Sequence, residues 1–260
     1  MHNRVRLALS AAILTIVPFL AQAQKSNIPM NNLSAPVAAS AADMARDVSV
    51  DQIVARLTEA NKKRTDDLKG YTEERRYSVT YHGFPAKLSA TMVVEATYEA
   101  PETKHFQIVS LTGSKLLGDR VLKRLLTTEE AAARNPQETA LDPTNYTFTL
   151  VGQEVVDGRP CYQLAVVPKT GSKLLYRGTI WVDAGDYAVV KIDAQPAQNP
   201  SFWIRSTEIH HVYAKTGAFW LPEHNESDTQ VRLGGSAVLT IDYGAYKTTS
   251  TDPTIAAGGH

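Results

Sequence analysis

Histidine side chains in the second half of the chain are the first candidates for chemistry. His210 and His211 are adjacent, and His224 and Glu226 lie in a segment that could approach them. Such side chains offer the nitrogen and oxygen ligands that zinc takes in proteins. Adjacent residues of a β-strand point to opposite faces of a sheet, so His210 and His211 cannot easily share one ion. We therefore predict no metal and no other cofactor.

Carboxylates and motifs give no stronger case for catalysis. Asp183 and Asp186 flank Ala-Gly in a tight turn, where aspartate is expected for turn chemistry. The sequence has no HExxH, GxSxG or paired CxxC motif. We therefore predict a protein that is not an enzyme. A periplasmic hydrolase or metal enzyme is the alternative, and its turnover would depend on His210, His211 or His224.

Two other groups of reactive side chains have structural explanations. Cys161 is the only cysteine, which excludes an intrachain disulfide, and it opens the alternating apolar run Cys161–Val167. This pattern predicts a buried small residue rather than a catalytic thiol. The charged run Glu73–Arg76 puts both signs on both faces of a strand. Solvated cross-strand pairing explains that run more simply than catalysis does.

The elements that position these residues form a ladder of short strands from Tyr176 to Tyr246. Residues of high strand preference recur there, and the breaks carry Gly, Asp, Asn or Pro. Strands begin again before the ladder at Asn145. The turns expected between strands lie at Asp157-Gly158, Ala184-Gly185-Asp186, Leu221-Pro222 and Gly234-Gly235. This pattern predicts an antiparallel sheet that faces a core on one side.

Helical spacing appears in two places before this ladder. Ser49 opens a capping-box pattern followed by an amphipathic helix, with Gly70 as the predicted stop signal. The leucine-rich run Leu116–Leu126 predicts a second amphipathic helix, and Thr127 with Glu130 predicts the cap of a third. Strands Tyr71–His82 and Leu88–Tyr98, and a third strand from Lys104, lie between the first two helices. The predicted order is helix, strands, helices, strands.

The start of the chain resembles a secretory signal peptide over residues 1–23. Arg4 and Arg6 precede the apolar run Leu7–Leu20, and Ala21-Gln22-Ala23 is a small-x-small cleavage site. A retained membrane anchor is the alternative, but the run is short for a bilayer span of roughly 20 residues. No cysteine lies near the cleavage site, so we predict no lipoprotein anchor. The expected location is a bacterial periplasm.

The rest of the chain reads as one large domain. We predict a flexible leader over residues 24–48, a folded domain over residues 49–247, and a disordered tail over residues 248–260. Removal of residues 1–23 leaves 25 basic against 27 acidic residues, a formal net charge of −2. That balance argues against nucleic acid as a partner. We expect a monomer.

Short motifs within the folded domain resemble the LolA/LolB-like family of outer-membrane lipoprotein-sorting proteins. They are Tyr98–Pro101 running into Lys104–Gln107, the strand Gly178–Asp183, and Phe219–Pro222. The resemblance covers residues 49–246. It implies an α+β fold in which a large curved antiparallel sheet forms an unclosed β-barrel, with helices covering its concave face.

The same resemblance implies a function. Such proteins bind lipid or lipoprotein acyl chains in the periplasm without catalysis, and some carry lipoproteins to the outer membrane. Membrane-associated lipoprotein machinery would then be a further partner. An RseB-like sensor domain that binds a protein partner is the alternative. In the carriers an arginine that helps release the lipoprotein precedes a proline, but this chain has Ala100 before Pro101.

An acyl-binding cavity would be lined by apolar side chains of the strands and of the leucine-rich helix. The alternative is that these side chains form a filled core. The residues that we predict to line the cavity are Met92, Val94, Leu117, Val121, Leu122, Leu125, Trp181, Trp203 and Trp220.

Overall fold

The computed structural model describes residues 48–84, 86–199, 201–232 and 234–251. The predicted signal peptide, the leader up to residue 47 and residues 252–260 of the predicted tail lie outside this part of the chain. Within it, no helix is both long and apolar enough to cross a membrane.

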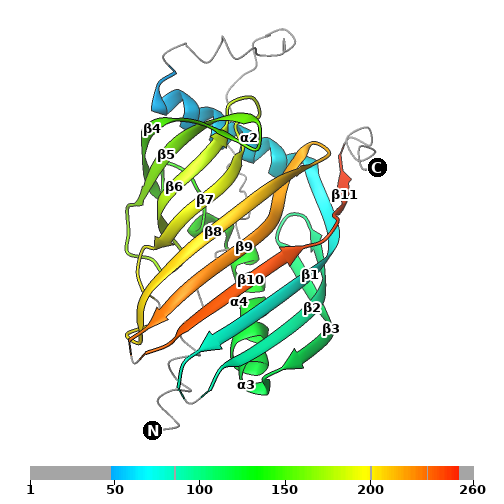
Figure 1. Cartoon of the computed structure of the whole chain (residues 1–260). Coiled ribbons are helices and arrows are strands. Elements are labelled where there is room, and N and C mark those ends of the chain that lie inside the picture. The colour runs from blue at the N-terminus through cyan, green and yellow to red at the C-terminus, as the bar shows by residue number, and fades with distance from the viewer. Residues whose placement is uncertain (1–47, 85, 200, 233, 252–260) are drawn as a thin grey trace.

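Eleven strands form one antiparallel sheet, which is curved and wraps around the helices (Figure 1). The order of ten of them is β3-β2-β1-β10-β9-β8-β7-β6-β5-β4, and β11 pairs with β1. Strands β3 and β4 form the two edges, so the barrel is not closed, as predicted. The strands are β1 Leu68–His82, β2 Leu88–Glu99, β3 Thr103–Gly113, β4 Tyr146–Val156, β5 Arg159–Pro168, β6 Tyr176–Asp183, β7 Val189–Pro196, β8 Ile204–Thr216, β9 Phe219–Val231, β10 Ser236–Tyr243 and β11 Lys247–Ser250.

Alternation of side chains gives the sheet one buried face. Every second residue from Ala90 to Tyr98 in β2 is buried, and the same period continues in β1 from Tyr77 to Tyr81. The register places Tyr77 opposite Met92 on one side and opposite Ile241 on the other. Neighbouring strands therefore bring their inward side chains into continuous rows across the sheet.

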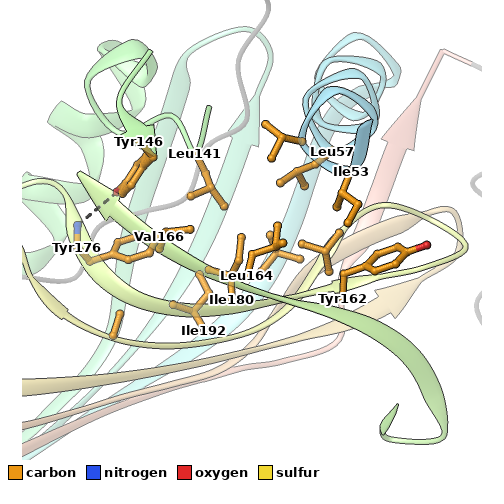
Figure 2. Close-up of a cluster of buried hydrophobic side chains, with 14 of the residues drawn as sticks. Ile53, Leu57, Leu141, Tyr146, Tyr162, Leu164, Val166, Tyr176, Ile180 and Ile192 are labelled. Carbon is orange, nitrogen blue, oxygen red and sulfur yellow. Dashed lines mark hydrogen bonds between the residues drawn. The ribbon is translucent and has the colours of Figure 1, made fainter. Parts of the chain in front are cut away.

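Helix α2 (Val50–Asp67) covers one half of this face. Its N-terminus has the predicted capping box, in which the Ser49 hydroxyl accepts from the Gln52 amide at 3.3 Å and the Gln52 side chain accepts from the Ser49 amide at 3.1 Å. Ile53 and Leu57 pack into a cluster with side chains of β5, β6 and β7 (Figure 2). At the edge of this cluster the Tyr176 amide donates to the Tyr146 hydroxyl.

One continuous helical segment, residues 115–134, covers the other half; we call it the plug helix. It consists of α3 (Lys115–Leu117), the π-helical turn η2 (Gly118–Leu122) and α4 (Lys123–Arg134). A 3-10 turn, η3 (Pro136–Glu138), follows it. The predicted cap at Thr127 is wrong, because Thr127 lies inside α4 and its hydroxyl donates to the Lys123 carbonyl.

Three predicted boundaries differ from the structure. Helix α2 ends at Asp67, and Gly70 lies inside β1, where an added Cβ would approach the Tyr98 carbonyl oxygen to 2.8 Å. The tail was predicted to begin at residue 248, but β11 pairs there with β1 through backbone hydrogen bonds that composition does not reveal. Pro222 lies within β9 rather than in a turn, opposite Tyr213 and next to a register shift in the pairing with β8.

Candidate functional site

Seven of the nine predicted cavity residues come together between the sheet and the plug helix. Six of them are almost fully buried in one cluster: Met92, Val94, Leu117, Val121, Leu122 and Leu125. Trp203, the seventh, packs against this cluster at its margin. The plug helix therefore occupies the apolar surface on which a ligand was predicted to lie.

The other two tryptophans lie elsewhere in the fold. Trp181 is buried in a small separate cluster, and its indole N–H donates to Glu154 at 2.7 Å. Trp220 packs near helix α2, and its indole N–H donates to Asp186 at 2.9 Å. Both side chains are thus remote from the cluster beneath the plug helix.

The plug helix presents one apolar stripe to the sheet. Residues spaced by three or four positions are buried, and they are Leu117, Gly118, Val121, Leu122, Leu125, Leu126, Glu129, Ala132 and Ala133. Gly118 begins the π-helical turn, and a Cβ at this position would lie 3.1 Å from the Leu111 side chain of β3. The absence of a side chain there lets the helix approach the edge strand closely.

Glu129 interrupts this stripe with a charge, and the sheet supplies the partners. Its carboxylate accepts from the Arg75 guanidinium at 2.6 Å, from the Tyr77 hydroxyl at 2.7 Å and from the Lys104 ammonium at 3.2 Å. Arg75 also donates to Glu73 at 2.8 Å. We call Glu73, Arg75, Lys104 and Glu129 the charge cluster. Two positive and two negative side chains balance in it, and each is at most 7% exposed.

Aromatic rings complete the surroundings of Arg75. Its guanidinium carbon lies 4.4 Å from the centre of the Tyr243 ring and 5.5 Å from that of Phe106. Tyr243 in turn accepts from the Asn225 side chain at 2.8 Å. Ring faces attract cations, so these contacts help to stabilise the buried charge of Arg75.

The environment shifts the two carboxylates in opposite directions. Burial alone would raise the pKa of Glu129, but the charges of Arg75 and Lys104 and the hydrogen bonds of Tyr77 and Lys104 hold it below its ordinary value. Burial also raises the pKa of Glu73, and Arg75 offsets this only in part. One oxygen of Glu73 is buried without a hydrogen-bond partner among the described residues. Glu129 is therefore the better stabilised anion.

The prediction that Glu73–Arg76 is solvated is wrong for Glu73 and Arg75. The sequence held two signals of their burial. Glu73 and Arg75 alternate with Tyr71, Tyr77 and Val79 on one strand face, and Glu129 falls on the apolar stripe of its helix. Charged residues at positions that the period assigns to the core are expected to be paired.

The remaining candidates for chemistry have structural roles. His210 is exposed and pairs with Asp193 at 2.7 Å, whereas the adjacent His211 is buried on the other face, as the strand period predicts. His224 pairs with Asp242 at 2.7 Å. No group of three or more His, Cys, Asp or Glu side chains in the described part of the chain is arranged to hold a metal ion.

The turn aspartates and the cysteine also match their structural predictions. An oxygen of Asp183 accepts from the amides of Gly185 and Asp186 at 2.9 and 2.7 Å, which is the predicted turn chemistry. Cys161 is 1% exposed, and burial raises the pKa of its thiol to about 11. A thiol with so high a pKa is protonated and unreactive at neutral pH.

A family model described as "Uncharacterized protein" matches residues 137–253, and no curated protein matches the chain. A DUF1329 family protein from Desulfovibrio piger is 14% identical over 76% of this chain and 92% of its own, with a TM-score of 0.41. A putative outer membrane lipoprotein-sorting protein domain from Vibrio parahaemolyticus is 9% identical over 78% and 95%, with a TM-score of 0.37. A LolA superfamily protein from Nitrosomonas europaea is 11% identical over 81% and 98%, with a TM-score of 0.36. Proteins of the family that the sequence motifs resemble are thus among the solved structures similar to this chain.

Proposed function

We propose that this protein binds the acyl chain of a lipid or lipoprotein in the periplasm, without catalysis, on the apolar face beneath the plug helix. One observation carries the proposal. The apolar side chains of β1, β2 and β10 are covered by a single helical segment, rather than by a second layer of sheet. An acyl chain offers the same apolar character as Leu117, Val121 and Leu122, and can therefore take their place.

The energetics of this exchange are favourable for a long chain. Burial of each CH₂ group contributes about 0.8 kcal/mol, so a chain of a dozen carbons contributes on the order of 10 kcal/mol before the cost of ordering it. Displacement of the plug helix forfeits a comparable apolar contact. How firmly the helix is held therefore sets how much of the acyl-chain binding free energy remains.

The charge cluster is the feature that sets this balance. Glu129 ties the plug helix to β1 and β3, and three donors on the sheet lose their acceptor when the helix leaves. Water or a polar headgroup then has to solvate Arg75 and Lys104. In the LolA-like carriers an arginine that helps release the lipoprotein stands where this chain has Ala100. In this proposal the charge cluster takes over that role, so release of the ligand depends on Glu129.

Native mass spectrometry of protein purified from its own periplasm, with organic extraction, tests the proposal. We expect co-purifying lipid or lipoprotein, and saturable binding of a photoactivatable fatty acid that excess palmitate suppresses. Crosslinks are expected on β1, β2, β10 and the plug helix. A lipid-free protein that binds no probe, or crosslinks confined to the sheet edges, would refute the proposal. A protein partner retained without lipid would instead favour the sensor alternative.

A further inference from the structure

A cleft lies between helix α2 and strands β7, β8 and β9. We call it the α2 cleft. Its volume is about 190 Å³. Its apolar wall includes Val189, Phe219 and Trp220, and its polar wall includes Arg64. A cavity of about 150 Å³ can hold benzene, so the α2 cleft has room for a ring or a short aliphatic chain.

The carboxylates of this cleft are already matched by other cations. Asp67 pairs with Lys63 on the next turn of helix α2. Asp186 accepts from Lys215 at 2.7 Å, from Arg159 at 3.0 Å and from the Trp220 indole at 2.9 Å. Neither aspartate forms an ion pair with Arg64.

Arg64 is a cation of this cleft that has no carboxylate partner among the described residues. Its guanidinium has five N–H donors, and its hydrogen bond in the structure is a long one of 3.4 Å to the Trp220 carbonyl. No carboxylate of the described residues lies within ion-pair distance of it. The side chain is half-buried, which removes part of the water that would otherwise solvate the charge.

The neighbours of Arg64 do not neutralise it. Burial lowers its pKa, and the groups that act in the opposite direction are the phenols of Tyr71, Tyr98, Tyr213 and Tyr246. Burial raises the pKa of Tyr98, Tyr213 and Tyr246, so these phenols are neutral at pH 7. An arginine stays charged in such surroundings because its ordinary pKa is above 12. A half-buried charge without a carboxylate partner favours an anionic ligand.

We propose that the α2 cleft binds a small organic monocarboxylate whose apolar part has about six to eight carbons. The carboxylate pairs with the Arg64 guanidinium, whose planar fork matches two oxygens at once. The apolar part lies against Val189, Phe219 and Trp220. None of the residues that line the α2 cleft belongs to the apolar cluster beneath the plug helix.

Calorimetric titration of the full chain with octanoate, octanamide and acetate at pH 7 tests this proposal. We expect octanoate to bind at least tenfold more tightly than octanamide, which has the same tail without the charge. Acetate should bind more weakly than octanoate because it lacks the tail. Equal affinities for octanoate and octanamide, or no binding of octanoate at millimolar concentration, would overturn the proposal.

Three variants locate the binding. Arg64→Gln should abolish the preference for octanoate over octanamide. Arg56→Gln is the matched control, since Arg56 lies on the same helix but is exposed over the Tyr187 ring, and it should change nothing. Ala60→Leu fills the cleft and keeps Arg64, so it should remove octanoate binding even if Arg64→Gln fails to fold. Octanoate binding that survives Ala60→Leu would place it elsewhere, for instance beneath the plug helix, and would refute the site.

Discussion

Replacement of Glu129 by glutamine isolates the charge that holds the plug helix on the sheet. The side chain keeps its size and one acceptor oxygen, but Arg75 and Lys104 are left with Glu73 as their only anion in the charge cluster. Removal of one partner from a buried ion pair costs about 3–5 kcal/mol. We take the lower end, about 3 kcal/mol, because glutamine still accepts a hydrogen bond.

This loss should fall on the plug helix rather than on the whole fold. Since 1.4 kcal/mol is a factor of ten, about 3 kcal/mol raises the population with the helix displaced by roughly 100-fold. A ligand that needs the displaced state binds more tightly in proportion to that population. The variant should therefore bind a fluorescent fatty acid up to roughly 100-fold more tightly than the wild-type protein.

Native-state hydrogen exchange of α4 and α2, measured together with probe affinity, distinguishes release of the plug helix alone from destabilisation of the whole fold. We expect the amides of α4 to lose protection while those of α2 keep it. Glu130→Gln is the control, since Glu130 lies on the same helix and forms no ion pair with the described residues; it should stay within about 0.5 kcal/mol of wild type. Equal loss of protection in α2 and α4, or an unchanged probe affinity, would refute a separately held plug helix.

Four further predictions concern stability and reactivity. The pKa of Glu129 is lower in the folded protein than its unfolded-state value of about 4.3, so ionised Glu129 stabilises the fold above that pH. This stabilisation is lost as pH falls through the folded-state pKa. The free energy of unfolding of wild type in urea should therefore exceed that of Glu129→Gln by less and less below about pH 4.3. Burial lowers the pKa of His211 to about 4, so as pH falls below about 6.5 the unfolded chain takes up a proton before the folded protein does. The free energy of unfolding should therefore fall by up to about 3 kcal/mol between pH 6.5 and 4. His211→Gln should remove this pH dependence. Ser49→Ala removes an N-cap and should lower the free energy of unfolding by about 1 kcal/mol, an expectation that an unchanged urea midpoint would contradict. Rapid labelling of Cys161 by a thiol reagent in the native state would show that its burial is wrong.

The alternation of apolar and polar residues predicted the sheet and its inward face, because successive side chains of a strand point to opposite faces. Residues Ala90 to Tyr98 are buried at every second position, as the pattern required. The capping box at Ser49 likewise depends on residues three apart, so it was readable from the sequence alone. Features of this local kind need no knowledge of the partner elements.

The parts that could not be predicted depend on contacts between distant segments. Glu73 and Glu129 are 56 positions apart, and only the docking of the plug helix shows that both are buried beside Arg75. Local composition predicted that the charges of Glu73 and Arg75 are solvated, whereas pairing with a distant segment buries them. The strand β11 was missed for the same reason, since its polar residues gain strand structure only by pairing with β1.

The division of the concave face explains how one helix can leave without unfolding the other half. A row of paired inward residues runs from Met92 through Tyr77 and Ile241, then through Asn225 and His211, and on to Ile192, Ile180 and Leu164. The polar pair in the middle separates the apolar cluster beneath the plug helix from the cluster beneath α2, and the two clusters share no residue. Because each helix covers its own apolar region, displacement of the plug helix exposes only the first. If a ligand displaces the plug helix as proposed, we expect the core around Ile53 and Leu57 to keep the sheet folded.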